Sequence, residues 1–560
     1  MLKLKNVHLA LADESDQFLL KNVSIQYPRG HFGAIVGPSG CGKSTLIKVI
    51  SGIHPNTSGE VLWDSRDLDE EKDLDPGEIG YVPQFSIAFD RLTVRENVEC
   101  TLQLRKKIKS KEIDHRVDTL LKTVGLLEFA DRPTQVLSGG QKRRLALALE
   151  LTSNPALLLC DEVTSGLDIK SEDQIVELLR NLSRENSRIV LSVTHSLRHL
   201  HLYDSITVLY KGHLAYIGPP EMLLPYFKVE SIEDIYVRLA ERTPEAWHER
   251  FEKARTDRDE HHEVAPAAPA DLDYSLPNPI SQFWILWCRR WKLFFREKGQ
   301  LILQFALIAI FPAIVVIFAL DGLPQIQNAA MDNGSSVIDQ LKDAVTLTQQ
   351  ASRIGGLVSG LIIFQVVLLT LMGANNTARE IVSERLLLEK EKLAGLSVGS
   401  YLASKIGFVI FLIVAQSAWM TIFVKSICNF PGPLESQFLL LCLANAAMTF
   451  VCLGISAWCK TPEQSSLISV YFVGFQLPLS GAVLAMPAFL GTIVRPLIAT
   501  YWGWSGMLHT IRETRQYDLV KSIVSTPLSN TETCIWVLSI HILFGILFAY
   551  LGAWRSKWTE

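Results

Sequence analysis

Two different hydrophobic patterns divide the chain near residue 280. Before that point, short apolar stretches alternate with charged segments, for example at Leu2–Leu11, Phe32–Val36, Ala156–Cys160 and Ile189–Val193. Short alternating or apolar runs that end at glycine or a charge are typical of strands. After that point, apolar runs of about twenty residues follow one another, long enough to cross a bilayer as helices. The pattern predicts an α/β domain followed by an all-α membrane domain.

Six apolar runs are candidate membrane spans, and at about 1.5 Å per residue each covers one bilayer core. They are approximately Leu301–Leu320, Ile354–Ala374, Ile406–Val424, Gln437–Ala457, Leu467–Ala485 and Cys534–Ala553. An even number of spans returns the C-terminus to the side of the N-terminal domain. Cations after the second span and at the C-terminus place both on the cytoplasmic side, whereas cations between the fifth and sixth spans weaken the argument.

Composition excludes several classes of protein. Hydrophobic residues make up 48% and charged residues 20% of the 560 residues, which is too apolar for a purely soluble protein of this length. The net charge of −4 gives no sign of a nucleic-acid partner. The nine cysteines show no CxxC pairing, which argues against a zinc site or a disulfide framework. The charged, strand-like start of the chain has no cleavable signal, so we expect the N-terminus in the cytoplasm.

A glycine-rich loop follows the apolar stretch Phe32–Val36. It matches the pattern GxxxxGK[ST] and consists of Gly37, Pro38, Ser39, Gly40, Cys41, Gly42, Lys43 and Ser44, followed by Thr45. Such glycines let successive backbone N–H groups face a phosphate, and the helix that starts near Lys43 adds its positive end. The loop predicts ATP binding, with Lys43 on the β- and γ-phosphates and Ser44 on Mg²⁺. A glycine-rich turn with a chance lysine is the alternative, which eight matching positions disfavour.

The apolar run Ala156–Cys160 ends in two carboxylates, Asp161 and Glu162. Carboxylates at the end of a buried strand are costly unless a cation meets them. The metal ion on ATP would be that cation, with Asp161 holding it through its water shell and Glu162 polarising the attacking water. An acidic pair alone is more often a solvated strand end, so this assignment depends on the neighbouring motifs.

Further motifs follow in the order found in ABC ATPases. Leu137, Ser138, Gly139, Gly140 and Gln141 resemble the ABC signature motif, which binds the ATP of the partner domain. Gln84 resembles the Q-loop glutamine and would also serve the metal, His195 resembles the switch histidine, and Ser165 to Asp168 resemble the D-loop. Phe18 occupies the place where many ABC ATPases stack an aromatic ring on adenine, although a core phenylalanine fits nearly as well. Residues 1–235 therefore resemble an ABC nucleotide-binding domain, with departures at Cys41 and Val163.

The order of the two domains resembles the ABCG (White/pigment-type) half-transporters, and we expect a bacterial member. The resemblance implies an ABC domain at 1–240, a linker of low order at 241–279, an interfacial helix at 280–299 and a six-span domain at 300–560. Tryptophans at helical spacing among cations in 280–299 support the interfacial assignment. The segment around Glu384 and Arg385 resembles the family's coupling helix. Phe364, Phe475 and Leu477 would line the substrate cavity between the second and fifth spans, but ordinary packing explains such residues equally well.

One phosphate loop and one signature motif imply a second subunit. In ABC ATPases the signature motif of one domain closes over the ATP bound by the other, so a second copy is the simplest partner and a heterodimer is the alternative. The resemblance implies an ATP- and Mg²⁺-dependent exporter of hydrophobic or amphipathic compounds in the cell membrane, surrounded by membrane lipids. A mechanotransducer that acts on an outer partner is the alternative function, although the outer segments look short for one. An importer fits the fused domain order less well.

Overall fold

The computed structural model groups the chain into two units. The first comprises Met1–Ile285 together with Lys390–Leu396, and the second comprises Leu286–Glu389 together with Ser397–Glu560. Within these units the structure describes residues 1–11, 14–64, 66–68, 77–85, 87–196, 198–256, 275–320, 323, 337–484, 486–556.

A six-stranded sheet in the order β10-β9-β3-β8-β7-β6 lies at the centre of the first unit. Its strands are β3 (Phe32–Val36), β6 (Ile79–Val82), β7 (Leu157–Asp161), β8 (Ile189–Val193), β9 (Ser205–Tyr210) and β10 (His213–Gly218). Only β10 is antiparallel to its neighbour. Every residue of β3, β7, β8 and β9 is buried, as expected for strands covered on both faces. Because parallel strands end at one edge, the segments that follow β3, β6, β7 and β8 come together there.

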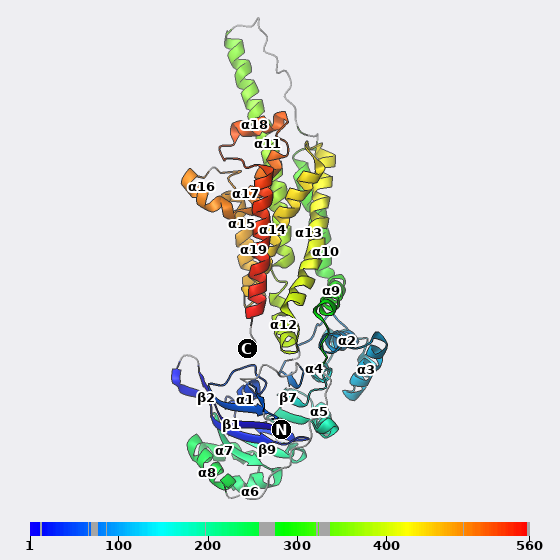
Figure 1. The fold of residues 1–560 in the computed structure, drawn as a ribbon, viewed down its shortest axis with the longest axis vertical. Helices are drawn as coiled ribbons and strands as arrows, with labels where there is room; N and C mark the ends of the chain where they lie inside the picture. Colours follow the sequence, from blue (N-terminus) through cyan, green and yellow to red (C-terminus); the bar gives the residue numbers. More distant parts are fainter. Residues whose placement is uncertain are drawn as a thin grey trace. The chain divides into compact units, whose positions relative to one another are not determined.

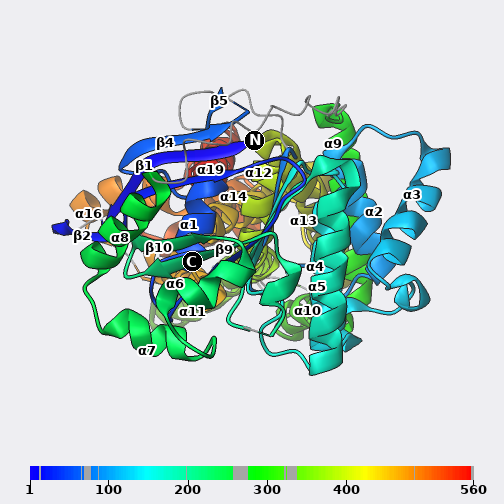
Figure 2. The ribbon, with the colours of Figure 1, turned by 90° about the horizontal axis from the view of Figure 1, so that it is seen from below.

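A smaller antiparallel sheet and a group of helices complete the ATPase part of this unit. The sheet has the order β2-β1-β4-β5, with β1 (Leu2–Leu11), β2 (Glu14–Tyr27), β4 (Ser58–Trp63) and β5 (Arg66–Asp67). The helices are α1 (Lys43–Ile50), α2 (Val94–Arg105), α3 (Ser110–Thr123), α4 (Gly139–Leu151) and α5 (Ile169–Arg184). Figure 2 shows α2 and α3 on the side of the unit opposite β1 and β4. Short 3₁₀ turns occur at Leu127–Phe129, Thr134–Val136, Glu185–Ser187, Leu200–Leu202 and Pro220–Met222.

Three helices follow the last strand and occupy part of the expected linker. They are α6 (Leu223–Phe227), α7 (Asp234–Ala240) and α8 (Pro244–Thr256). On α8, Trp247 is fully buried and its indole Nε1 donates a hydrogen bond of 3.0 Å to the carbonyl of Leu239. The structure thus has packed helix from residue 244, where the charged sequence predicted low order. The Ala/Pro-rich part of the expected linker, residues 257–274, lies outside the described residues.

The second unit is helical. Its elements are α9 (Pro279–Arg296), α10 (Lys298–Ile317), α11 (Val337–Thr377), α12 (Arg385–Leu393), α13 (Val398–Cys428), α14 (Leu434–Trp458), α15 (Pro462–Leu479), α16 (Ala488–Val494), α17 (Ala499–His509), α18 (Arg515–Ile523) and α19 (Thr531–Arg555), with 3₁₀ turns at Val382–Glu384 and Arg495–Leu497. The first turns of α9 and the end of α12 are grouped with the first unit.

Within the described ranges, five helical segments are long and apolar enough to cross a membrane: Lys298–Ile317, Ala344–Leu393, Val398–Cys428, Leu434–Trp458 and Thr531–Arg555. They cover the first, second, third, fourth and sixth expected spans. The fifth expected span, Leu467–Ala485, corresponds to α15, which ends at Leu479 and carries Gln476 and Pro478 in its last turn. Gly481, at φ +75°, lies against the side chain of Thr526 just after the helix.

Helix α11 is much longer than the span expected from hydrophobicity. Its 41 residues extend about 60 Å, roughly twice the thickness of a bilayer core. The expected span began at Ile354, whereas the helix begins at Val337. Figure 1 shows the first turns of α11 projecting past α18. A hydropathy pattern detects only the part of a helix that lies in lipid, so the polar extension was missed.

A closed ring of three side-chain amides joins α10, α11 and α13. Gln304 donates to Asn376, Asn376 donates to Gln416 at 3.1 Å, and Gln416 donates back to Gln304 at 3.1 Å. All three side chains are buried, and Asn445 of α14 adds a longer bond of 3.4 Å to Gln416. Since lipid offers no hydrogen-bond partners, the ring satisfies these amides internally.

Candidate functional site

The glycine-rich loop connects β3 to α1. The ammonium group of Lys43, 5% exposed, donates hydrogen bonds of 3.0 Å to the carbonyls of Gly37 and Pro38. The lysine is thus folded into the loop whose backbone amides would surround a phosphate. Helix α1 starts directly after Gly42 and presents its unpaired N–H groups at this point.

The last glycine of the loop lies against strand β2. Gly42 has φ +101°, and a Cβ atom there would stand 2.9 Å from the carbonyl oxygen of Leu19. Only glycine tolerates both conditions. The contact places the neighbouring Phe18 near the loop, with its ring 39% exposed and edge-on to His8. A core phenylalanine would be buried, so the exposure favours the adenine-stacking hypothesis for Phe18.

The metal-binding residues expected from the sequence come together at the end of β7. The hydroxyl of Ser44 donates to Asp161 Oδ1 at 2.9 Å, and the Tyr81 hydroxyl donates to Oδ2 at 3.4 Å. Burial raises the pKa of Asp161 against the effect of the Ser44 bond, and the adjacent Glu162 charge raises it further. A buried carboxylate that favours its neutral form would gain from a divalent cation, and oxygen donors are what Mg²⁺ prefers.

Glu162 is held by the two residues predicted to act with it. Gln84 Nε2 donates to Glu162 Oε2 at 3.0 Å, and His195 Nε2 lies 2.8 Å from Oε1. The three residues follow β6, β7 and β8, whose carboxyl ends share one edge of the sheet. Glu162 also has φ +49°, a left-handed conformation that costs about 1 kcal/mol or more in a residue with a Cβ atom. From this backbone position the carboxylate of Glu162 contacts Gln84 and His195.

The signature motif begins helix α4. Ser138 is its N-cap, its hydroxyl accepts from the Gln141 N–H at 3.3 Å, and the Gln141 side chain accepts from the Ser138 N–H at 2.9 Å. Ser138 and Gly139 are exposed, and a Cβ atom at Gly139 would meet no atom of the described residues within 4 Å. An open helix N-terminus of this kind is suited to an anion. In the D-loop, Ser165 is exposed and Asp168 caps α5 by accepting from the Ser171 N–H at 3.0 Å.

Two residues of this site were not singled out from the sequence. Tyr81 reaches Asp161 from the neighbouring strand β6, where the register pairs it with Leu159. Arg143 of α4 has its pKa lowered by burial and raised in part by the charge of Glu162. In the sequence, Tyr81 lies three residues before Gln84, and Arg143 lies two residues after Gln141. Their relation to the carboxylates depends on the pairing of β6 with β7 and on the position of Arg143 in α4, and neither is visible in the sequence.

A buried ion cluster surrounds Glu150 near the end of α4. Glu150 at the end of α4 is 3% exposed and accepts from Arg105 at 3.0 and 3.3 Å. Lys390 Nζ lies 2.6 Å from Glu150 Oε1 within the first unit. Burial alone would favour the neutral acid, but the two cations hold the pKa of Glu150 below its usual value.

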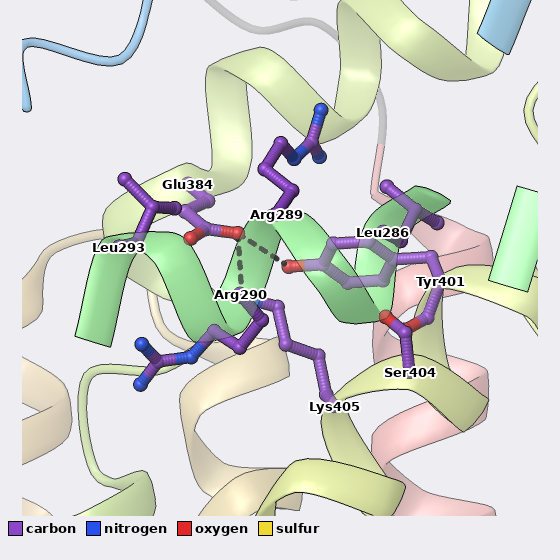
Figure 3. A pocket seen from close by; sticks show the side chains of 8 residues that line it. All are labelled: Leu286, Arg289, Arg290, Leu293, Glu384, Tyr401, Ser404 and Lys405. Atoms are coloured by element: carbon purple, nitrogen blue, oxygen red, sulfur yellow. Dashed lines mark hydrogen bonds and ion pairs between the residues drawn. The ribbon is translucent and has the colours of Figure 1, made fainter. Parts of the chain in front are cut away.

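Glu384, a predicted coupling residue, lines a small pocket in the second unit. Its carboxylate accepts from Lys405 at 2.6 Å and from Tyr401 at 3.4 Å, and Figure 3 shows both contacts. Lys405 also donates to Glu380 at 3.0 Å, and Arg290 of α9 forms a bidentate pair with Glu380. These buried charges tie α9 to the ends of α11 and α13.

The other predicted residues of the second unit are more dispersed. Arg385 donates to the carbonyl of Cys459 at 3.0 Å and to Glu389 at 3.0 Å. Phe475 on α15 is 61% exposed, whereas Phe364 and Leu477 are partly buried at the margin of the helical core. Helix α15 packs against α11, which carries Phe364.

The fold and the ATP site define the class of protein. The first unit is an α/β P-loop ATPase of the ABC type, and the second unit consists of apolar membrane helices. Residues 20–165 match the family model described as ABC transporter, and residues 281–508 match the model described as ABC-2 type transporter.

Relatives cover one or both parts. The ABC transporter ATP-binding/permease protein Rv1747 of Mycobacterium tuberculosis is 28% identical over 575 residues, which is 97% of this chain and 61% of the relative. The energy-coupling factor transporter ATP-binding protein EcfA1 of Mycoplasma mobile is 35% identical over 237 residues, which is 42% of this chain and 86% of the relative. A solved structure of the ATP-binding cassette MJ0796, dimeric and bound to ADP and Pi, has a TM-score of 0.36 at 33% identity, covering 39% of this chain and 99% of its own.

The chain belongs to the ABC transporter family and is an ABC-type ATPase. Its domain order fits an ABCG-like half-transporter. It spans about 61% of the length of the mycobacterial relative.

Proposed function

We propose that two copies of this chain form an ATP-driven exporter of hydrophobic or amphipathic compounds. The observation that carries the proposal is the convergence of Gln84, Glu162 and His195 beside the Ser44–Asp161 pair, on a chain that also has membrane helices. This is the set of groups needed to hold Mg-ATP and to position water for in-line transfer.

Mg²⁺ would be held by Ser44 and Asp161, with Gln84 close by, and would neutralise charge that develops on the phosphates. Lys43 would exchange its carbonyl partners for phosphate oxygens. Glu162 would polarise the attacking water, while His195 and Gln84 orient its carboxylate. Within the described ranges, no group of three or more His, Cys, Asp and Glu residues could hold a metal ion by itself, so the nucleotide would complete the metal's coordination.

A second copy would supply the missing contact on the γ-phosphate. Each chain has one phosphate loop and one exposed signature helix, so two identical chains would form two complete sites. The solved structure of the ATP-binding cassette MJ0796 is dimeric, which is a property of that protein. A different ABC subunit as partner remains the alternative, and the mass and composition of the purified particle distinguish the two.

The segment that follows α11 would couple ATP hydrolysis in the first unit to transport by the second. Lys390–Leu396 is grouped with the ATPase unit, while Glu384 is fixed by Lys405 and Tyr401 in the membrane unit. One short segment thus has partners in both units, as a transmitter of domain closure would need. Phe364 and Phe475, on the adjacent helices α11 and α15, are the residues we propose to contact substrate.

We place the protein in the cell membrane as a multi-pass protein, with α15 as the fifth of its six spans and both termini in the cytoplasm. The mechanotransducer alternative is favoured by one observation, the extension of α11 beyond its expected span. Reconstituted vesicles distinguish the two functions. An exporter accumulates a labelled lipid or amphipathic compound with ATP, and Glu162→Gln abolishes the accumulation. ATP turnover without movement of any compound in a broad panel would favour the mechanotransducer.

A further inference from the structure

The ring of Phe18 has two neighbours that belong to none of the ATP motifs. The His8 ring lies edge-on to Phe18, with the two centroids 5.9 Å apart and the planes at 68°. Edge-to-face packing is a favourable arrangement of two rings, so it fixes their relative orientation. The ammonium group of Lys21 lies 6.0 Å from the centroid of the same ring. Since Phe18 remains 39% exposed, its ring is supported and still offers surface to a flat ligand.

His8 is itself held from both sides. It lies in β1, the strand between β2 and β4. Its carbonyl accepts a hydrogen bond of 2.8 Å from the Thr57 N–H, and its ring Nδ1 accepts one of 3.4 Å from the Asn22 N–H of β2. The orientation of the His8 ring therefore depends on the position of Asn22.

The side chain of Asn22 connects β2 to helix α8. Asn22 Nδ2 lies 3.1 Å from His248 Nε2, and His248 Nδ1 lies 3.2 Å from the carbonyl oxygen of Leu214 in β10. A carbonyl only accepts hydrogen bonds, so Nδ1 carries a proton and donates it, and Nε2 of the neutral ring accepts from the Asn22 amide. Helix α8 packs against β10, and β10 packs against β2. His248 thus fastens β2 to the end of the ATPase part of the chain.

Backbone hydrogen bonds join the same strand to the phosphate loop. The Lys21 N–H donates to the carbonyl of Gly212 at 2.9 Å, and the Gly212 N–H donates to the carbonyl of Cys41 at 3.0 Å. The turn between β9 and β10 therefore connects β2 to the loop. Strand β2 carries Phe18 at a set distance from the site of the phosphates, and α8 holds that strand from its other side.

We propose that helix α8 sets the affinity of the ATP site for the nucleotide base, acting through His248 and Asn22 on the ring of Phe18. The inference rests on the ATP site and on the stacking of adenine on Phe18, and it does not require the two-copy exporter. His8 is the second positioning residue, because it fixes the angle of the Phe18 ring. A ring that is already held in place loses little conformational freedom when a base stacks on it.

Ribose 5′-triphosphate, which lacks the base, separates recognition of the base from recognition of the phosphates. The KM and kcat of ATP hydrolysis and the inhibition constant of ribose 5′-triphosphate are measured on the full-length protein. Base stacking on an aromatic ring predicts that Phe18→Ala raises the KM about tenfold. We expect His8→Leu and His248→Ala to raise it about threefold or more, with an unchanged kcat and an unchanged constant for ribose 5′-triphosphate.

Two conservative variants and one control complete the set. His8→Phe keeps the edge of a ring against Phe18, and His248→Gln keeps an acceptor for the Asn22 amide, so both should retain nearly the wild-type KM. His115→Ala is the control, because His115 is exposed on α3, on the side of the unit opposite β1 (Figure 2).

The contradicting results differ from one another. An equal rise of the constants for ATP and ribose 5′-triphosphate would mean that the variants disturb the fold or the phosphate loop, and it overturns the proposal. An unchanged KM in Phe18→Ala overturns it by removing the stacking. A raised KM in Phe18→Ala, with wild-type values in His8→Leu and His248→Ala, overturns the role of α8. A failure of transport in vesicles contradicts the exporter alone, since all these constants are measured on ATP hydrolysis.

Discussion

At the residue scale, the adjacent carboxylates of Asp161 and Glu162 have different hydrogen-bond partners. Asp161 is buried against Ser44 and Tyr81, whereas the left-handed backbone at Glu162 directs the next carboxylate to Gln84 and His195. Neighbouring residues on a regular strand would point to opposite faces. In this structure the two carboxylates have separate partners, as the proposed division between metal binding and water activation requires.

The role of Glu162 predicts a specific loss of function. Glu162→Gln keeps the hydrogen-bonding shape but removes the charge that polarises water, so we expect ATP hydrolysis to fall by about 10²-fold or more while ATP binding persists. Turnover and nucleotide binding are measured on the same sample. Glu185→Gln, which changes an exposed carboxylate outside the site, is the control. Wild-type turnover in Glu162→Gln would contradict the water-positioning role.

The raised pKa of Asp161 predicts how hydrolysis responds to acid and magnesium. As pH falls through this raised pKa, the carboxyl takes up a proton and would release the Mg²⁺ that we propose it binds. Activity should therefore decline at a higher pH than an ordinary aspartate would cause, and excess Mg²⁺ should move the decline to lower pH by competing with the proton. Turnover is measured against pH at two Mg²⁺ concentrations.

Tyr81→Phe provides the matched variant for that experiment. The Tyr81 hydrogen bond lowers the pKa of Asp161, so its removal should shift the acid decline to higher pH. An acid decline that does not depend on Mg²⁺ in either protein would mean that Asp161 is not the titrating ligand.

The sequence predicted most of this site because its residues follow strands or begin helices. Gln84, Asp161, Glu162 and His195 were identified from motifs that resemble those of ABC ATPases, and the structure brings the four side chains together. Tyr81 and Arg143 were missed because their link to the carboxylates runs across strands and helices, which no local spacing reveals.

At the element scale, the hydrophobic pattern predicted elements that are apolar along their whole length, and it missed helical segments that only a few buried residues hold in place. The buried strands β3, β7 and β8 read clearly as apolar runs. Helix α8 did not, because it is charged and its docking depends chiefly on Trp247 and Phe251. The length of α11 was missed for a related reason, since its outer turns are largely polar.

The docking of α8 predicts that Trp247 is important for the stability of the first unit. Trp247→Ala would leave a cavity beside Phe227 and lose the hydrogen bond to the Leu239 carbonyl, so we expect a loss of about 3–5 kcal/mol. The first thermal transition of the purified protein should fall clearly. Trp554→Ala, which removes a side chain that is 65% exposed, is the control. An unchanged transition in Trp247→Ala would contradict the packing of α8.

The amide ring between α10, α11 and α13 predicts a second stability effect. Asn376→Leu breaks two bonds of the ring and leaves the buried Nε2 group of Gln304 without its acceptor, at a cost of about 1–2 kcal/mol. Thermal unfolding in detergent reports this change, and Gln350→Leu on the exposed face of α11 is the control. Equal stability of both variants would mean that the ring contributes nothing to helix packing.

At the scale of the whole molecule, the proposed function assigns to each chain one half of each of two shared ATP sites. Its phosphate loop lies at the edge of the sheet with the carboxylates, and its signature serine lies exposed at the start of α4. The proposed function requires that the signature motif of another copy complete the ATP site.

Complementation between two inactive variants tests this claim most directly. Lys43→Ala removes the phosphate-binding ammonium and Ser138→Arg blocks the signature helix, so each variant alone should lose nearly all ATP hydrolysis. When the two are co-expressed, random pairing makes about half of the dimers mixed, and each mixed dimer has one intact site. We predict that the co-expressed sample recovers up to roughly a quarter of wild-type turnover. No recovery in co-purified mixed dimers, or full turnover by an isolated single chain, would contradict the shared site.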